Sequence, residues 1–66
     1  SNVKLININT AGVSELMTLP GIGESRANDI IRYRTENGGF GCIEDIKKVS
    51  GIKDAAYSKI KDLIQV

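Results

Sequence analysis

The sequence predicts an all-α domain in which two helical hairpins share one core around a pseudo-two-fold axis. Residues 13–30 align with residues 43–60 at a constant offset of 30, and apolar residues keep their places throughout the alignment. In both copies the apolar residues recur at helical spacing on either side of a Gly-Ile turn. We therefore expect a single domain over residues 1–66, with one hairpin unit at about 10–36 and a second at about 42–64.

The composition is typical of one small globular domain. The chain has 66 residues, of which 41% are hydrophobic and 26% are charged, so disorder is not expected. A single cysteine excludes an internal disulfide and the lack of histidine removes the commonest zinc ligand, so stability must come from regular helix packing. Because the net charge is only +1, any affinity for nucleic acid must come from local arrangement. Ser1-Asn2 resembles a remnant of tag removal, and we expect the chain to come from a longer protein.

The first unit is predicted to begin with a short helix over about 11–18. Its apolar stripe consists of Val13, Leu16 and Leu19. Asn9 or Thr10 is the expected N-cap, because such side chains accept hydrogen bonds from the first amides of a helix. Pro20 disfavours helical geometry in the residue before it and so ends this helix.

A longer helix is predicted over 24–36. The chain reverses just before it, and Gly21 and Gly23 are expected to adopt the positive φ that a tight reversal needs. The Asn-Gly-Gly run at 37–39 ends the helix, because glycine accepts the left-handed conformation common after a helix C-terminus. The inward face of this helix is expected to consist of Ala27, Ile30, Ile31 and Arg34.

The second unit repeats this plan, with a short helix over 43–48, a Ser-Gly turn at 50–51 and a helix over 54–64. The inward face of the last helix is expected to consist of Ala56, Ile60 and Leu63. Phe40, the only phenylalanine, is expected to fill the gap between the two units. The remaining apolar surface is expected to be covered by Leu5, Ile6 and Ile8.

The stretch Leu-Pro-Gly-Ile-Gly at 19–23 indicates more than a simple turn. Ile22 is expected to turn inward, which leaves the backbone on either side exposed. Because glycine lacks a Cβ atom, another molecule can approach this backbone closely, and the first amides of the following helix have no partner inside the helix. These amides lie at the positive end of the helix dipole, an arrangement that binds phosphate. Two such turns related by a pseudo-dyad match the two phosphate backbones across the minor groove of a DNA duplex, and such contacts read no bases.

The segment Leu-Pro-Gly-Ile-Gly-Glu-Ser-Arg-Ala at 19–27 resembles the helix-hairpin-helix motif of repair polymerases, ligases and excision nucleases. Together with the stretches ININTA, IIRYRTENGGF and IEDIKKVSGI, nearly the whole chain resembles the ComEA-like domain of bacterial competence proteins. The resemblance implies a tandem helix-hairpin-helix fold, a compact helical domain of the SAM-like kind. It also implies that the domain captures double-stranded DNA during natural transformation. In such bacterial proteins the domain is tethered outside the cytoplasmic membrane or secreted to the periplasm.

The resemblance implies DNA contacts at both turns. In the first, backbone amides would meet a phosphate, the Ser25 hydroxyl would add a hydrogen bond and Arg26 a charge-assisted one. The second turn departs from the pattern, because Lys53 replaces the second glycine and either adds a positive charge or blocks close approach to the backbone. The expected DNA-binding residues are Gly21, Ile22, Gly23, Glu24, Ser25, Arg26, Gly51, Ile52 and Lys53.

Several other side chains are expected to have structural roles. A surface ion pair is predicted between Arg32 and Glu36, four residues apart on one helix. Tyr33 and Arg34 are expected to brace the packing between the hairpins. Cys42 is expected to be a small packing residue, buried or half-buried.

The sequence contains no catalytic arrangement: it has no histidine, no carboxylate pair with a supporting acid–base partner and no nucleophile beside a base. We expect no enzymatic activity, no cofactor and no metal site, and leave open a monovalent cation held by the turn carbonyls. The alternative function is a structural or protein–protein interaction module with the same fold. The near-zero net charge and the altered second turn favour that alternative.

Overall fold

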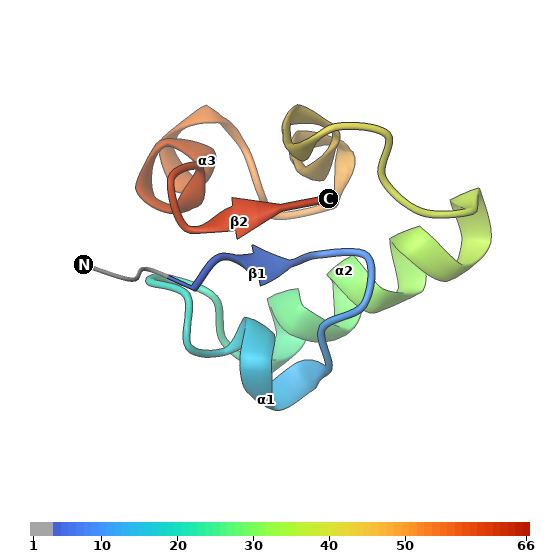
Figure 1. The fold of residues 1–66 in the computed structure, drawn as a ribbon, viewed down its shortest axis with the longest axis horizontal. Coiled ribbons are helices and arrows are strands. Elements are labelled where there is room, and N and C mark those ends of the chain that lie inside the picture. Colours follow the sequence, from blue (N-terminus) through green and yellow to red (C-terminus); the bar gives the residue numbers. More distant parts are fainter. Residues whose placement is uncertain (1–3) are drawn as a thin grey trace.

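Six elements follow one another in the computed structural model, which describes residues 4–66. Ser1 and Asn2 lie outside the described residues. In Figure 1 the first hairpin lies below a central pair of short strands and the second lies above it. The predicted helical fold class is confirmed. The elements are β1 (Ile6–Asn7), α1 (Val13–Leu16), α2 (Glu24–Asn37), the 3-10 helix η1 (Ile43–Lys48), α3 (Asp54–Ile60) and β2 (Ile64–Gln65).

The core confirms the internal repeat. Residues at equivalent places in the two units are both buried, and the four clearest pairs are Leu16 with Ile46, Leu19 with Val49, Ile22 with Ile52 and Ile30 with Ile60. Each of these side chains contributes about 1.5–3 kcal/mol by leaving water. Because the pairs come from both units, the two hairpins share one core and neither could bury its apolar face alone.

The first helix is shorter than predicted, and its N-cap differs. The expectation that Asn9 or Thr10 caps it is wrong: the N-cap is Gly12, which is extended and supplies no side-chain hydrogen bond. Asn9 instead reaches the linker between the units. Its Nδ2 donates to the Phe40 carbonyl at 3.0 Å, and its Oδ1 accepts from the Phe40 amide at 2.6 Å. Because the Asn9 side chain both donates to and accepts from the Phe40 backbone, it is not available to cap α1.

Phe40 fills the gap between the two units, as predicted. It is buried, and its ring stacks on Tyr33 of α2 with 5.1 Å between the ring centroids. Arg34 does not brace the two hairpins as expected. Its Nη1 donates to the carbonyls of Ile8 and Ala11, at 3.0 and 2.6 Å, and so ties α2 to the N-terminal segment of its own unit.

The last helix ends at Ile60, four residues earlier than the predicted boundary. The chain then turns, and β2 pairs with β1 in parallel, with Ile6 opposite Ile64. The buried Ile64 and the exposed Gln65 alternate as expected of a strand with one face on a core. The N-terminal segment has backbone groups that need partners, and the end of the chain satisfies them. The segment before the first hairpin and the segment after the second are thus joined to each other through β1 and β2.

Two surface expectations are wrong. Arg32 pairs with Asp29, one turn back on α2, at 3.1 Å, and not with Glu36. Cys42 is exposed. It is the extended residue just before η1, and the apolar contact at this point is made by the half-buried Ile43.

Candidate functional site

The first turn connects α1 to α2 and is closed by one backbone hydrogen bond. The Ile22 amide donates to the Leu19 carbonyl at 3.1 Å, and Gly21 between them has a φ of +78°. This left-handed conformation favours glycine. Ile22 is only 4% exposed, whereas its neighbours Gly21 and Gly23 are exposed. The apolar residue therefore anchors the turn to the core and leaves the flanking backbone at the surface.

Gly23 does not adopt the positive φ that the sequence suggested. Its φ of −92° and ψ of −172° describe an extended N-cap of α2, which any residue can adopt. A Cβ atom at Gly23 would find no heavy atom within 4 Å. Neither backbone strain nor internal packing requires glycine here. What glycine adds at this position is free space in front of the backbone.

The second turn has the same backbone conformation as the first. The Ile52 amide donates to the Val49 carbonyl at 3.1 Å, and Gly51 has a φ of +88°. Lys53, which replaces the second glycine, is an extended N-cap with φ of −117° and ψ of −168°. The substitution changes the side chain presented at this turn and leaves the path of the backbone unchanged.

The first amides of α2 and α3 have no hydrogen-bond acceptor within the described part of the chain. Neither N-cap supplies a side-chain hydrogen bond. Such amides lie at the positive end of a helix, where an anion is stabilised. Among residues 4–66, no acceptor is bonded to the amides of Glu24, Ser25, Arg26, Asp54, Ala55 and Ala56. The two turns thus present two equivalent sets of free donors.

Arg26 connects the two turns. Its Nε donates to the Gly51 carbonyl at 3.1 Å, although 25 residues separate them in the chain. The sequence suggested only a phosphate contact for this exposed side chain. A Cβ atom at Gly51 would lie 3.4 Å from the Arg26 Nε, so glycine also leaves room for the guanidinium. The contact spans the two units, and neither copy of the repeat carries a signal for it.

The charges beside the second turn are partly neutralised. The Lys47 ammonium lies 3.4 Å from the Asp54 carboxylate at the start of α3, and 5.1 Å from the centre of the Tyr57 ring. Asp54 therefore brings less negative charge to the free amides than its position suggests. Lys53 makes no ion pair within the described part of the chain, and neither does Glu24 at the start of α2.

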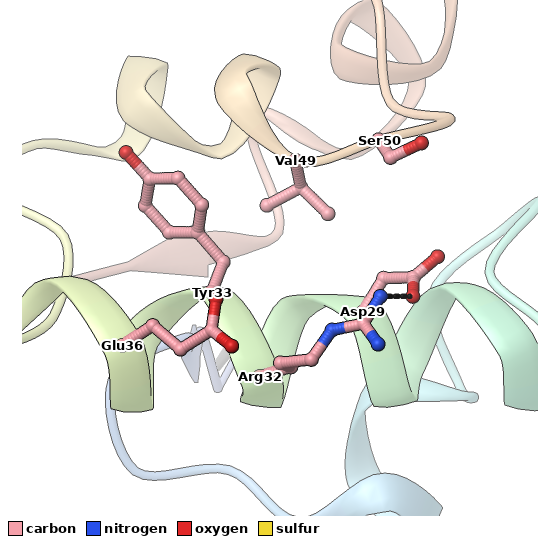
Figure 2. Close-up of a pocket in the computed structure, with 6 residues that line it drawn as sticks. All are labelled: Asp29, Arg32, Tyr33, Glu36, Val49 and Ser50. Atoms are coloured by element: carbon pink, nitrogen blue, oxygen red, sulfur yellow. Dashed lines mark hydrogen bonds and ion pairs between the residues drawn. The ribbon is translucent and has the colours of Figure 1, made fainter.

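A small groove of about 170 Å³ lies between α2 and the start of the second turn. Figure 2 shows α2 on one side of the groove and the segment before the second turn on the other, with Arg32 paired to Asp29. Glu36 adds a second carboxylate beside this ion pair, so the lining has a net negative charge that disfavours an anion. The lining residues are Asp29, Arg32, Tyr33, Glu36, Val49 and Ser50.

Two kinds of site or segment are absent from the described residues. Over positions 4–66, no three His, Cys, Asp or Glu side chains gather in a way that could hold a metal ion. No helix in that range combines the length and apolar character needed to span a membrane.

Comparison with known proteins supports the resemblance drawn from the motifs. A family model described as the helix-hairpin-helix motif matches residues 1–65. ComE operon protein 1 of Bacillus subtilis is 55% identical over 62 residues, which cover 94% of this chain and 30% of that protein. Endonuclease/exonuclease/phosphatase family domain-containing protein 1 of Homo sapiens is 43% identical over 60 residues, or 91% of this chain and 10% of that protein. The chain therefore spans less than a third of the length of each of these two relatives.

Proposed function

We propose, from the premise that this chain belongs to the helix-hairpin-helix family, that it binds double-stranded DNA through phosphate groups on both strands. The observation that carries the proposal is the pair of turns with matching backbones, each followed by helix amides that have no partner among residues 4–66. Amides at a helix N-terminus bind phosphate, and phosphate contacts carry no information about the bases. The binding is therefore independent of sequence.

Each turn has its own way of meeting a phosphate. At the first, the bare backbone of Gly23 lets a phosphate oxygen come within hydrogen-bond distance of the amides, and the exposed Ser25 hydroxyl adds a donor. At the second, the Lys53 ammonium supplies a positive charge where the first turn has open space. The residues that carry the proposed contacts are Gly21, Ile22, Gly23, Glu24, Ser25, Arg26, Gly51, Ile52 and Lys53.

The pseudo-two-fold relation of the turns suits the two phosphate backbones that face each other across a minor groove. Three or four effective phosphate contacts give a slope of roughly −3 for log K against log salt, and a dissociation constant of about 10⁻⁴ to 10⁻⁶ M. Such weak binding becomes useful when several domains, or a membrane tether, hold the module near DNA.

The similarity to ComE operon protein 1 supports a role as the DNA-binding module of a competence receptor in a bacterium. In that role the module is non-enzymatic and acts outside the cytoplasmic membrane, attached to a membrane tether or further domains. Its proposed partner is the DNA duplex, and no cofactor is proposed.

A titration followed by heteronuclear NMR tests this function. Uniformly ¹⁵N-labelled protein is mixed with a short DNA duplex at low salt. We expect amide shifts confined to residues 21–26 and 51–55, which fade as salt is added. No shift at millimolar duplex would refute DNA binding and favour the interaction module. Shifts centred on Lys59 and Lys61 instead would refute the turns as the site.

A further inference from the structure

We propose that Arg26 is a positioning residue that holds the two turns at a fixed separation, and that this separation makes the domain prefer duplex over single-stranded DNA. The inference rests on the proposed function. It assigns to Arg26 a role in addition to contact with phosphate, namely the link between the two binding turns.

The hydrogen bond from Arg26 to Gly51 is the sole polar tie between the hairpins at this place. Within the described residues, no other hydrogen bond or ion pair joins residues 19–37 to residues 43–60. Among residues 4–66 the remaining polar links between the units involve other segments: the strand pair β1–β2, the Gln65 side chain that donates to the Leu5 carbonyl, and the contact of Asn9 with the linker. The apolar core joins the helices, and Arg26 joins the turns.

The acceptor lies at the apex of the second turn. The Gly51 carbonyl belongs to the peptide that leads into Ile52, which is fully buried and bonded to Val49. This peptide directs the chain into Lys53 and the free amides of α3. A donor fixed on the Gly51 carbonyl therefore fixes where the second set of phosphate donors lies relative to the first.

A fixed separation affects duplex and single-stranded DNA differently. A duplex presents two phosphate backbones at a constant spacing, so two turns held at a matching spacing bind as one bivalent unit with a high effective concentration. A flexible single strand has no second backbone at a set distance and gains little from the tie. Arginine has five N–H donors, and the bond to Gly51 uses one of them. The guanidinium charge thus remains available to either kind of DNA.

Three variants separate the effect of the Arg26–Gly51 hydrogen bond from the effect of the Arg26 charge. In Arg26→Gln the Nε2 amide is bonded to Cδ, as the arginine Nε is, so a donor is kept at the same place without the charge. Arg26→Met has a similar length without donor or charge. Lys59→Met removes one positive charge from an exposed position of α3 that makes no ion pair within the described residues. Dissociation constants for a short duplex and for one of its strands are measured at the same low salt.

We expect Arg26→Gln and Arg26→Met to lose the same factor in single-strand affinity, because both lose the charge. The ratio of duplex to single-strand affinity stays near that of the wild type in Arg26→Gln and in Lys59→Met. It falls about fivefold in Arg26→Met, because the two turns no longer act together. In the free protein, the Ile52 amide shift, which senses the hydrogen bond on the preceding carbonyl, changes in Arg26→Met and is restored in Arg26→Gln.

Two results overturn the inference, and they differ from failure of the proposed function. If Arg26→Gln and Arg26→Met have the same ratio, Arg26 acts through its charge alone. If Arg26→Met keeps the wild-type ratio, the tie does not set the preference. In both cases the wild type still binds duplex. If the wild type binds no duplex, the proposed function fails and this inference fails with it. Unchanged amide shifts in β1 and β2 establish that each variant is folded.

Discussion

Replacing Gly23 with valine tests whether DNA approaches the backbone of the first turn. The side chain fits the folded protein, since Gly23 is extended and a Cβ atom there would have no neighbour within 4 Å. Lys53, with almost the same backbone angles in the second turn, already carries a side chain. Valine should therefore leave the fold intact and place two methyl groups in front of the amides of α2.

Gly12→Val is a matched control. Gly12 is also an exposed helix N-cap, with φ of −87° and ψ of 178°, and it too has no heavy atom within 4 Å of a Cβ position. Both substitutions place valine at an N-cap, where it is less favourable than glycine by about 0.5–1 kcal/mol. Each should lower the melting temperature by roughly 2–8 °C, because about 1 kcal/mol corresponds to 4–8 °C in a domain of this size. Only Gly23→Val should weaken DNA binding.

The size of the effect follows from the number of phosphates bound. With about three contacts, the affinity of the wild type should fall roughly 40-fold between 50 and 200 mM salt, since the slope is near −0.9 per phosphate. If valine blocks the first turn, about half of the contacts are lost and the fall over the same range should be roughly sixfold. At low salt we expect at least about tenfold weaker binding, because one site of a bivalent pair is lost.

Fluorescence anisotropy of a labelled duplex measures these affinities across the salt range. Gly12→Val should reproduce the wild-type curve. Lys59→Ala, which removes a charge outside the turns, should cost less affinity than Gly23→Val. If the lysine variant costs more, or if Gly23→Val keeps the wild-type salt slope, a diffuse basic surface binds the DNA and the amides of the first turn do not.

Three further outcomes test other parts of the structure. Asn9→Ala should lower the free energy of unfolding by about 2–3 kcal/mol in denaturant titrations, because two hydrogen bonds to half-buried backbone groups are lost. A loss below about 0.5 kcal/mol would contradict a stabilising role for the Asn9–Phe40 contact. Lys53→Met should reduce the magnitude of the salt slope of DNA binding by about one, the value for one phosphate contact. Partial desolvation raises the pKa of Asp45, but the Gly41 amide and Lys48 outweigh it and lower the pKa below 3.8. The stability from this carboxylate is thus present above pH 3.8 and is lost as the pH falls through the lowered pKa. The melting temperature of Asp45→Asn should therefore fall less than that of the wild type as the pH is lowered through this range, and an equal fall would exclude this role.

The internal repeat made the architecture predictable from the sequence. Apolar positions at helical spacing, repeated with an offset of 30, identified both turns and the residues buried behind them. Gly21 and Gly51 were expected to permit sharp reversals, and their φ values of +78° and +88° are of the kind that glycine favours. These features depend on neighbours a few residues apart, so a local pattern contains the information.

Two of the errors occurred where distant segments compete for the same group. Asn9 has the side chain of a helix cap, but the backbone of Phe40, 31 residues away, offers it two hydrogen bonds at once. The predicted helix over 54–64 fits the local apolar spacing, yet Ile64 pairs with β1 because the N-terminal segment needs backbone partners. Local propensity is a weak preference that such contacts readily reverse.

The sequence by itself determined the two hairpins, their shared core and the exposed glycine backbone, because these depend on short-range periodicity and on which residues can turn the chain. Only the tertiary structure decided how the two turns are joined. The bond from Arg26 to Gly51 and the closure of the two chain ends through β1 and β2 link segments 25 or more residues apart. Such contacts form only after the shared core has brought the two units together, so no pattern within either unit encodes them.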